Sequence, residues 1–520
     1  MNTDSRTVNS IRNIGSGFIG QLIQTAAGFA NRTIFVYYLS VEYLGLNGLF
    51  ASILSMLALA ELGLGSAFTY SLYKPLAEGE KQTIAGILGL YRKAYHTIGI
   101  TIFIIGLALM PFLNAIIGPK PEAITENIYI LYLFFLFNTA ATYFFSYKIA
   151  LLNADQRNYI STFNYSVFFV LQNVVQIIVL IWTRNFLYYL CAQAVFQLAS
   201  NFSISIITDK YYPFLKTFRK EKIDPFIRKG IIKNAKATFL IKIGGVLVNN
   251  TDNLIINYFS GLVLVGLASN YNLLIGIATA MIVQIFNNVS SSIAQVNVRE
   301  TKAKQYEVFS LINFANFWIY GWGAIAISLL MGDFIQLWIG EKFVLPFSIA
   351  VMLAVNFFMV GMQSAVWTFK STYGFFNEGK YLVILTAILN LLFSFVLGSV
   401  YGLFGILLAT ALARVSTNFW YDPFVVFKKG LQKPPSTYAL KLAIYVVVLL
   451  ITFVTTYFAL QWNMTLTWWV FIAKAFLCLL IPNLIFVVFF FKREEFKILA
   501  RTTTGSLQML KRMVTKSGSV

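Results

Sequence analysis

The stretch of sequence that decides the fold is residues 209–233, DKYYPFLKTFRKEKIDPFIRKGIIK. It holds eight Lys and Arg residues against three acids, and nearly unbroken hydrocarbon lies on both sides of it. A polar segment of this size in so apolar a chain must lie outside the lipid bilayer, where its charges stay hydrated. The segment therefore divides the chain into two membrane-embedded parts, and its stretch 211–226 can lie on the membrane surface.

The composition of the whole chain points to the same class of protein. Of its 520 residues, 58% are hydrophobic and only 12% are charged, whereas soluble domains carry about 25% charged residues. The sequence therefore predicts an integral membrane protein. Its net charge of +20 would by itself indicate nucleic-acid binding. Lys and Arg of membrane proteins gather in cytoplasmic loops, however, so we expect no nucleic-acid partner.

Residues that bind metals or form disulfides are scarce. The two cysteines, Cys191 and Cys478, lie inside apolar runs, and His96 is the one histidine. No spacing typical of a disulfide framework or a metal site is present. We expect no metal and no cofactor. We also expect no cleavable signal peptide, because the first apolar run is too long.

Apolar runs long enough to cross a bilayer recur along the chain. A membrane-spanning helix needs about 20 mostly apolar residues. By this criterion the sequence predicts fourteen helices: 14–39, 43–70, 92–117, 127–152, 159–183, 186–208, 235–259, 263–294, 308–332, 344–370, 381–400, 402–422, 438–460 and 465–491.

The loops between these helices differ in charge. One set, which includes both termini, contains most of the Lys and Arg residues, and the opposite set contains only Lys120, Arg184 and Lys342. Positive loops stay in the cytoplasm. We therefore expect a multi-pass protein of the bacterial plasma membrane with both termini in the cytoplasm. The loops on the outer side are all short, which leaves no room for an outer domain.

Two pairs of segments recur at nearly the same offset. Residues 31–40 match residues 251–260, with Tyr38 on Tyr258, and the eleven-residue spacing from Lys148 to Tyr159 recurs from Lys370 to Tyr381. Chance similarity between apolar helices is the alternative. A true repeat predicts two six-helix, pseudo-symmetric lobes related by an axis along the membrane normal. The lobes would be residues 1–208 and 234–422, joined by the cytoplasmic basic linker 209–233, and residues 423–520 would add helices 13 and 14 and a basic cytoplasmic tail.

Four short motifs carry a resemblance to a known family: NR at residues 31–32, EYLGLNGL at 42–49, LAELGLGSA at 59–67 and NADQR at 153–157. With them the chain resembles the Wzx-type polysaccharide repeat-unit flippases of the multidrug/oligosaccharidyl-lipid/polysaccharide exporter superfamily. The resemblance implies a fourteen-helix, two-lobed transporter. Such a protein moves undecaprenyl-diphosphate-linked oligosaccharides from the cytoplasmic to the outer leaflet. Related members flip lipid II or export cationic drugs.

Charged residues inside the predicted helices are candidates for function. Each costs about 2.5–3.5 kcal/mol at a helix centre, so such side chains face a cavity or a partner. The deep ones are Arg32, Glu61, Lys242, Asp252, Arg414 and Lys474. Lys474, in the appended helices, is expected to meet lipid headgroups or to pack against the core. Lys148 and Lys370 lie near cytoplasmic helix ends, where we expect them to reach back to the interface.

A diphosphate headgroup needs cationic donors that can bind several of its oxygens at once. Arg32, Lys242 and Arg414 are therefore our candidates for that headgroup, because Arg offers a planar fork of donors. Arg32 and Asp252 occupy matching positions of the repeat. They could face each other as a gate or as substrate ligands, or they could form a fixed ion pair between the lobes.

Glu61 lies close to Gly63 and Gly65, in a segment of small residues. A buried carboxyl group has a raised pKa and can carry a proton. Glu61 is therefore our candidate for coupling transport to H+ or Na+. The alternative is that it pairs with a nearby lysine.

Amide side chains gather on certain helices. Gln193 and Gln197 share one helix face with Asn201, and Asn250 and Asn270 lie among further polar residues. Amides suit sugar hydroxyl groups, but they also hold membrane helices together, at about 0.6 kcal/mol each. We expect a cavity wall that contacts the substrate.

Together these features favour a flippase for lipid-linked oligosaccharides that serves the export of capsule, exopolysaccharide or O-antigen-type polysaccharide. Its partners would be the substrate, membrane lipids and the polysaccharide polymerase and export machinery. The alternatives of the same fold are a lipid II flippase and a drug exporter, and intramembrane bases that outnumber the acids disfavour cationic drugs. A membrane polymerase or ligase is less well supported, because no acid/base or nucleophile cluster is present, and we expect no enzyme.

Overall fold

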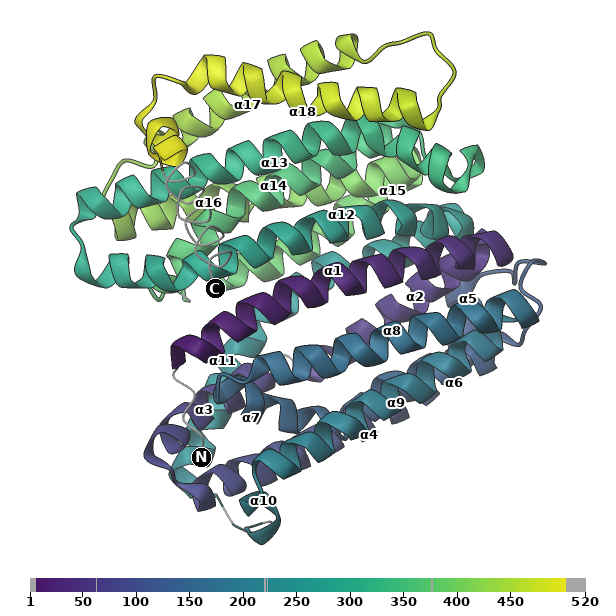
Figure 1. The fold of residues 1–520 in the computed structure, drawn as a ribbon, viewed down its shortest axis with the longest axis vertical. Coiled ribbons are helices and arrows are strands. Elements are labelled where there is room, and N and C mark those ends of the chain that lie inside the picture. The colour runs from purple at the N-terminus through teal and green to yellow at the C-terminus, as the bar shows by residue number, and fades with distance from the viewer. Residues whose placement is uncertain (1–5, 62, 219–220, 222, 376, 502–520) are drawn as a thin grey trace, which may run out of the picture. The chain divides into compact units, whose positions relative to one another are not determined.

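The computed structural model describes residues 6–501 except 62, 219, 220, 222 and 376. Every regular element in that range is a helix, because backbone groups in hydrocarbon must find their partners within the segment itself. The chain is an all-α, multi-pass membrane protein. By its internal contacts it forms two compact units, Met1–Gln284 and Ile285–Val520, which are coloured in chain order in Figure 1.

The first unit contains the basic linker as well as the helices before it. Its elements are α1 (Arg6–Tyr38), α2 (Val41–Leu57), α3 (Leu64–Glu78), α4 (Lys81–Leu109), α5 (Leu113–Ile117), α6 (Ile128–Thr142), α7 (Ile149–Ala154), α8 (Asn158–Thr183), α9 (Phe186–Tyr211), α10 (Phe214–Thr217), α11 (Pro225–Asn250) and the first part of α12 (Asp252–Arg299). The linker is thus partly helical, since α10 and the start of α11 lie within residues 209–233.

The second unit contains the end of α12 and the rest of the chain. Its further helices are α13 (Lys302–Ile339), α14 (Phe347–Thr372), α15 (Lys380–Val415), α16 (Asn418–Val425), α17 (Ser436–Ala459) and α18 (Trp468–Phe490). The boundary between the units falls inside α12. The division into lobes 1–208 and 234–422, with 423–520 as an addition, therefore stays a prediction.

The predicted spans all fall on helices. Ten helical stretches of the described residues are long and apolar enough to cross a membrane. One of them, Lys380–Leu431, covers two predicted spans, and α1, α2 with α3, and α11 account for the others. Several helices run further than their apolar cores: α4 begins at Lys81 and α13 ends at Ile339. The polar ends that we expected to be loops are thus partly helical.

The chain reverses inside α15 at Gly402, whose φ of 55° and ψ of −136° suit glycine. The residues that contact each other across this point lie at similar distances along the chain before and after it. A Cβ on Gly405 would lie 2.0 Å from the Leu397 carbonyl oxygen, and Asn390 donates to Thr410 over 2.9 Å. The two parts of α15 therefore form an antiparallel hairpin, as the predicted turn at residue 401 requires.

The predicted helices 43–70 and 127–152 are broken in the middle, as are 235–259 at Thr251 and 402–422 at residues 416–417. The span 43–70 is interrupted by a 3-10 turn at Ala58–Glu61 and by Gly63, whose φ is 90°. The span 127–152 ends its first helix at Thr142 and resumes through a 3-10 turn at Ser146–Lys148. Predicting continuous helices here was wrong, because uniform hydrophobicity does not reveal where the backbone changes direction.

Backbone meets backbone where α2 crosses α12. A Cβ on Gly45 would lie 2.1 Å from the Leu262 carbonyl oxygen, and one on Gly266 would lie 2.3 Å from that of Val41. Small residues allow this approach, as they do between many membrane helices. The two glycines thus bring α2 and α12 into direct main-chain contact within the first unit.

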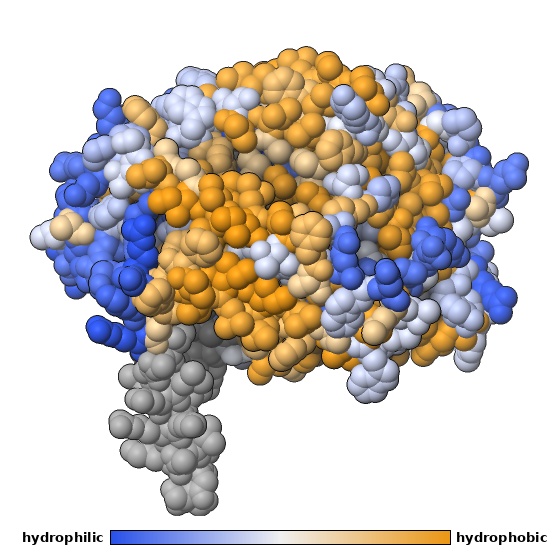
Figure 2. Space-filling view, turned by 90° about the horizontal axis from the view of Figure 1, so that it is seen from above, coloured by the Kyte–Doolittle hydropathy of each residue, from blue (hydrophilic) through white to orange (hydrophobic). Residues whose placement is uncertain are grey.

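Hydrophobic side chains cover much of the face shown in Figure 2, and hydrophilic residues gather toward its ends. Trp182, Val195, Val400 and Val488 are each more than half exposed. In water such exposure would be costly. In a membrane protein these side chains meet lipid.

In the second unit, polar contacts join helix α18 to α13. Lys474 Nζ lies 2.7 Å from Asp333 Oδ2, and Trp318 Nε1 donates to Asn483 Oδ1 over 2.7 Å. Lys474 is therefore paired with a carboxylate inside the protein. Of the two expectations for Lys474, contact with the rest of the protein agrees with this pair, and contact with lipid headgroups does not.

Candidate functional site

The break between α2 and α3 places Glu61 among tyrosines of two other segments. Its Oε1 accepts a hydrogen bond from Tyr95 of α4 over 2.6 Å, and its Oε2 accepts one from Tyr143, which follows α6, over 2.8 Å. Within the described residues Glu61 takes part in no ion pair. The partners of this carboxylate are phenols and not the lysine that we considered.

Further aromatic rings surround this carboxylate. Tyr91 stacks on Phe68 with ring centroids 4.1 Å apart and contacts Tyr95 at 4.3 Å. A Cβ on Gly65 would come within 3.3 Å of the hydroxyl oxygens of both tyrosines. Non-helical backbone at membrane depth is tolerated where it is buried in protein or lines a cavity, and broken helices mark sites in many transporters. Glu61 and these rings thus form one polar site in the first unit.

Arg32 lies on α1 and donates through Nη1 to Ser269 Oγ of α12 over 3.1 Å. No ion pair of Arg32 exists within the part of the chain that the structure describes. In lacking an ion pair Arg32 differs from Lys148, Lys370 and Lys474, each of which has a carboxylate partner. A guanidinium carries five donors, so Arg32 keeps binding capacity for an anion.

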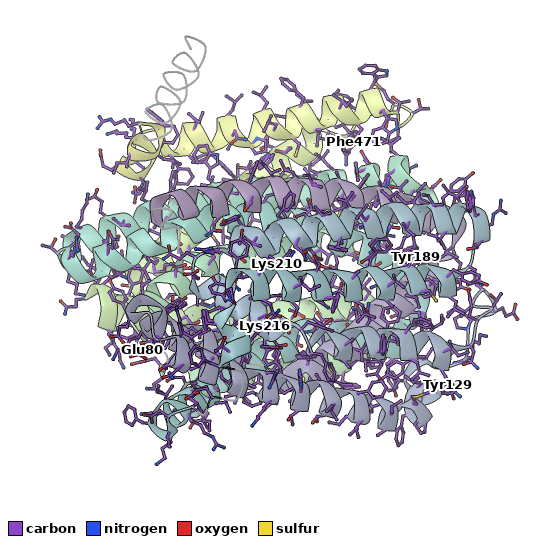
Figure 3. The ribbon with its side chains drawn as sticks, turned by 60° about the horizontal axis from the view of Figure 1, so that its bottom comes forward. Glu80, Tyr129, Tyr189, Lys210, Lys216 and Phe471 are labelled. Atoms are coloured by element: carbon purple, nitrogen blue, oxygen red, sulfur yellow. The ribbon has the colours of Figure 1, made fainter. Side chains whose placement is uncertain are left out.

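Beside Arg32, Asn31 joins α1 to α8 and α9. Its Nδ2 is near three acceptors: Asn173 Oδ1 at 2.6 Å, Gln176 Oε1 at 2.9 Å and the hydroxyl oxygen of Tyr189 at 3.2 Å. Figure 3 labels Tyr189, which belongs to α9. Further along the same interface, Gln24 donates to Ser166 over 2.9 Å. The constant spacing shows that α1 and α8 run parallel, held by amides.

Helix α12 contributes a second row of amides. Asn253 donates to Ser52 Oγ over 3.0 Å, and Asn257 donates to the carbonyl oxygen of Ile116 over 2.7 Å. Asn270, which follows Ser269 in sequence, is fully buried, and within the described residues neither of its amide atoms has a hydrogen-bond partner. A buried amide without partners is costly. Asn270 is therefore a predicted site residue with unused hydrogen-bonding groups, and it adjoins in sequence the partner of Arg32.

The other predicted site residues are distributed as follows. Asp252 and Asn250 are half-buried at the junction of α11 and α12, Gln193 and Gln197 are half-buried on α9, and Arg414 is half-buried on α15 in the second unit. The side chain of Lys242 lies outside the described residues. The structure thus brings Arg32 and Asn270 into one region of the first unit, and it does not join Gln193 or Gln197 to them by any contact.

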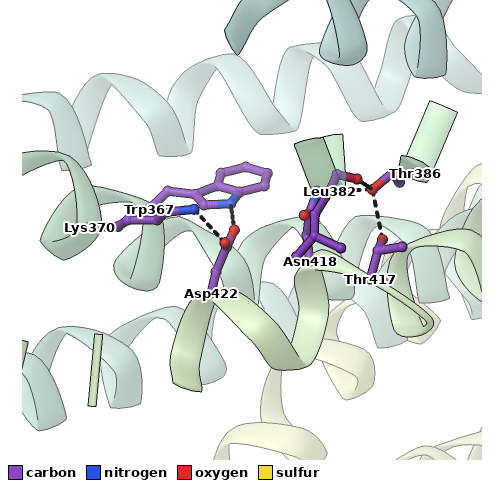
Figure 4. Close-up of polar contacts among 7 residues, drawn as sticks. All are labelled: Trp367, Lys370, Leu382, Thr386, Thr417, Asn418 and Asp422. Carbon is purple, nitrogen blue, oxygen red and sulfur yellow. Dashed lines mark hydrogen bonds and ion pairs between the residues drawn. The ribbon is translucent and has the colours of Figure 1, made fainter. Parts of the chain in front are cut away.

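The two lysines near predicted cytoplasmic helix ends are half-buried ion-pair partners. Lys148 Nζ lies 2.7 Å from Asp209 Oδ1, and Lys370 Nζ lies 2.6 Å from Asp422 Oδ1. Figure 4 shows the second pair, in which Trp367 Nε1 also donates to Asp422 over 3.2 Å. Expecting these lysines to reach back to the interface was wrong, because both retain at most 15% of their side-chain exposure.

Sequence reasoning missed several of these residues. Asn31 adjoins the predicted Arg32, and Asn173 and Gln176 are polar residues in an otherwise apolar span. Their polarity could therefore have marked them as site candidates. Tyr95 and Tyr143 offered no such signal, because tyrosines are common throughout this chain.

The second unit contains an apolar cavity of about 300 Å³. It lies between α13, α14, α15 and α17, and its walls are almost wholly hydrophobic, with Val355, Phe358 and Phe453 among them. Such a cavity suits a hydrocarbon chain and offers no charge to a polar ligand.

Comparison with solved structures shows which fold this is. The chain is similar to the lipid II flippase MurJ in its inward closed conformation, with 14% identity, 93% of this chain and 99% of that chain covered, and a TM-score of 0.60. It is also similar to an inward-facing multidrug resistance MATE family transporter of the MOP superfamily, with 16% identity, 81% and 99% covered, and a TM-score of 0.62. A MATE in the bent conformation matches with 16% identity, 83% and 97% covered, and a TM-score of 0.53.

No family model and no curated protein matches the chain. At these identities the structural likeness establishes a shared fold. The fold is the one that MurJ and the MATE transporters have in common.

Proposed function

We propose that this protein flips undecaprenyl-diphosphate-linked oligosaccharide repeat units across the bacterial plasma membrane by alternating access. The transported units would serve the export of capsule, exopolysaccharide or O-antigen-type polysaccharide. The fold shared with a lipid II flippase supports a lipid-linked substrate. A polar sugar headgroup cannot cross hydrocarbon unaided, because its hydrogen-bonding groups would lose water without gaining partners.

Arg32 is the observation that carries the proposal. It is an intramembrane cation that makes no ion pair in the described part of the chain, and its partner Ser269 is followed in sequence by an unsatisfied buried amide, Asn270. A diphosphate would supply the missing charge, and sugar hydroxyl groups would satisfy amides. Lys242 and Arg414 complete the proposed headgroup set, with Asp252, Asn250, Gln193 and Gln197 as further substrate contacts.

The apolar cavity next to α17 is evidence for a substrate that carries a lipid tail. MurJ matches over 93% of this chain and the MATE transporter over 81%. Helices α17 and α18 follow the two proposed lobes. The cavity beside them would receive part of the polyprenyl chain.

We further propose that Glu61 couples transport to H+ or Na+. Both of its carboxylate oxygens accept phenol hydrogen bonds, and the described residues supply no cation to it. Because no lysine neutralises this carboxylate in the described residues, its negative charge is available to a coupled cation. We expect cytoplasmic termini, and functional contact with the polysaccharide polymerase and export machinery.

Depletion of the protein tests the proposed substrate. Lipid-linked repeat units should accumulate, inaccessible to a membrane-impermeant reagent added from outside, while precursor synthesis continues. Accumulation of lipid II would indicate the lipid II flippase instead. A change in drug susceptibility with no accumulation of either lipid would indicate the drug exporter.

Arg32 provides the matched test within the chain. Arg32→Ala should abolish export in the complemented strain, whereas Arg184→Ala, which removes a cation that lies over the Tyr38 ring in an outer loop, should leave it unchanged. Full export by Arg32→Ala would overturn the role of Arg32.

A further inference from the structure

The basic linker forms one wall of a cavity in the first unit. This cavity has a volume of about 440 Å³ and is open on one side, and it is lined by α4, the 3-10 turn Ser146–Lys148, the end of α9 and α10. Arg92 of α4, Lys148, Asp209 and Lys216 supply its charges. A volume of this size falls in the range of small-ligand sites, about 300–1,000 Å³.

One acid–base pair in this cavity is already satisfied. Lys148 Nζ donates to Asp209 Oδ1 and Ser205 Oγ, each over 2.7 Å, and to the Ser205 carbonyl oxygen over 3.4 Å. These three acceptors account for the three protons of the ammonium group. The single carboxylate of the cavity is therefore neutralised by its own lysine.

Two cations remain. The side chains of Arg92 and Lys216 take part in no ion pair or hydrogen bond in the part of the chain that the structure describes, and both line the cavity. They come from separate elements, α4 and α10, which are packed together. Two uncompensated cations that converge on one pocket favour an anion, and the guanidinium fork in particular suits phosphate oxygens.

The surroundings of the pocket indicate that this anion is attached to a lipid. Phe202 and Ile206 precede Asp209 by seven and three residues and thus share its face of α9. They are 58% and 41% exposed. An apolar stripe therefore leads from the charged pocket along the membrane-spanning part of α9, where a hydrocarbon chain can follow it.

We propose that this pocket binds the phosphate headgroup of an anionic membrane lipid. The headgroup contacts Arg92 and Lys216, and the lipid tail lies along Phe202 and Ile206. Basic pockets between membrane helices hold anionic headgroups by this combination of charge and apolar contact. The shared chemistry is a lipid-borne phosphate, which a phospholipid or a polyprenyl phosphate can provide. The inference does not depend on the proposed transport function.

Native mass spectrometry of the full-length protein tests the proposal. The protein is released from detergent after incubation with phosphatidylglycerol, with undecaprenyl phosphate or with inorganic phosphate. Wild type should retain at least one of the two lipids, and the Arg92→Ala/Lys216→Ala variant should bind it roughly tenfold or more weakly, because each basic residue near the membrane adds about 1 kcal/mol. Inorganic phosphate should not displace the lipid at equal concentration.

The control removes two cations from neighbouring positions. Lys93 and Lys210 are exposed and do not line the cavity. Figure 3 labels Lys210 of the control pair and Lys216 of the pocket. Lys93→Ala/Lys210→Ala should bind lipid as wild type does. The milder pair Arg92→Gln/Lys216→Gln replaces the alanine variant if the latter has a lower melting temperature.

Each outcome decides the proposal. Selective loss for phosphatidylglycerol identifies a phospholipid site, and selective loss for undecaprenyl phosphate identifies a polyprenyl phosphate site. Equal binding by wild type and the pocket variants would overturn the inference. So would an equal loss in the control variant, or displacement of the lipid by inorganic phosphate.

Discussion

Lys370 Nζ lies 2.6 Å from Oδ1 of Asp422, and this contact has a counterpart in the first unit between Lys148 and Asp209 at 2.7 Å. In each case a lysine near the end of a predicted fourth helix meets an aspartate near the end of a predicted sixth. The helices beside them also match: Asn164 bonds to Ser200 and Ser203, and Thr386 bonds to Thr417 and Asn418. Such paired contacts are what an internal repeat would produce.

Removing one member of the buried pair should destabilise the protein strongly. Lys370→Met leaves Asp422, with 5% of its side chain exposed, as a buried charge without its cation, a change that costs about 3–5 kcal/mol. Lys429→Met breaks an ion pair with Glu378 whose lysine is 57% exposed, so it should cost about 0–1 kcal/mol. Unfolding in detergent micelles measures both. Equal losses would show that the buried pair is no more important than the exposed one.

The hairpin in α15 should depend on Gly405. Gly405→Ala places a methyl group where the Leu397 carbonyl oxygen already lies, 2.0 Å away, and overpacking of this kind costs about 1–3 kcal/mol. Gly276→Ala, at a helical position with nothing within 4 Å, should be neutral or slightly stabilising. Thermal unfolding midpoints compare the two. A Gly405→Ala midpoint at or above that of Gly276→Ala would contradict the packed hairpin.

A substitution at Glu61 can distinguish a role of this residue in ion coupling from a structural role. Glu61→Gln keeps an oxygen that can accept from Tyr95 or Tyr143, so we expect the variant to fold. If Glu61 carries the coupled ion, collapsing the H+ or Na+ gradient should stop export by wild type, and the glutamine variant should export poorly even with the gradient intact. Export by wild type that ignores both gradients would refute coupling at this residue.

Within the described residues Arg32 and Asp252 form no fixed ion pair, and reversing their charges tests this against a substrate site. If a structural pair did exist, the exchange Arg32→Asp/Asp252→Arg should recover the stability that either single change removes. A headgroup site should not tolerate the exchange, because the cation would no longer lie beside Ser269. Melting temperature and export are measured together, and recovery of export by the exchange would count against headgroup binding by Arg32.

The loop residue Glu378 should contribute a small pH dependence. The hydrogen bond from Lys429 holds the pKa of this carboxyl below its ordinary value of 4.5. Its contribution to stability is therefore present above pH 4.5 and is lost as the pH falls through the lower folded-state pKa. Below pH 4.5 the melting temperature of wild type should fall more steeply than that of Glu378→Gln. Parallel curves would show that the contact adds nothing in solution.

Hydrophobicity and turn residues were sufficient to predict the spans, because each apolar run must become a helix in lipid. The turn at Gly402 and the loop at Arg184 were predicted for the same reason. The breaks at residues 58–63 and 143–148 were not, since packing between segments determines them. Side-chain partners were also beyond reach: Asp209 is 61 residues from Lys148, and Ser269 is 237 residues from Arg32.

The crossing of α2 and α12 has a mechanical consequence. Gly45 and Gly266 leave main chain against main chain at their own positions, where they carry no side chain that could interlock with the facing helix. At these two positions the helices can slide or separate without a rotamer change. If export requires these helices to part, the resistance comes from the few hydrogen bonds that flank the crossing, such as the one from Asn253 to Ser52. The rate at which the two helices separate would then depend on how fast these flanking hydrogen bonds break.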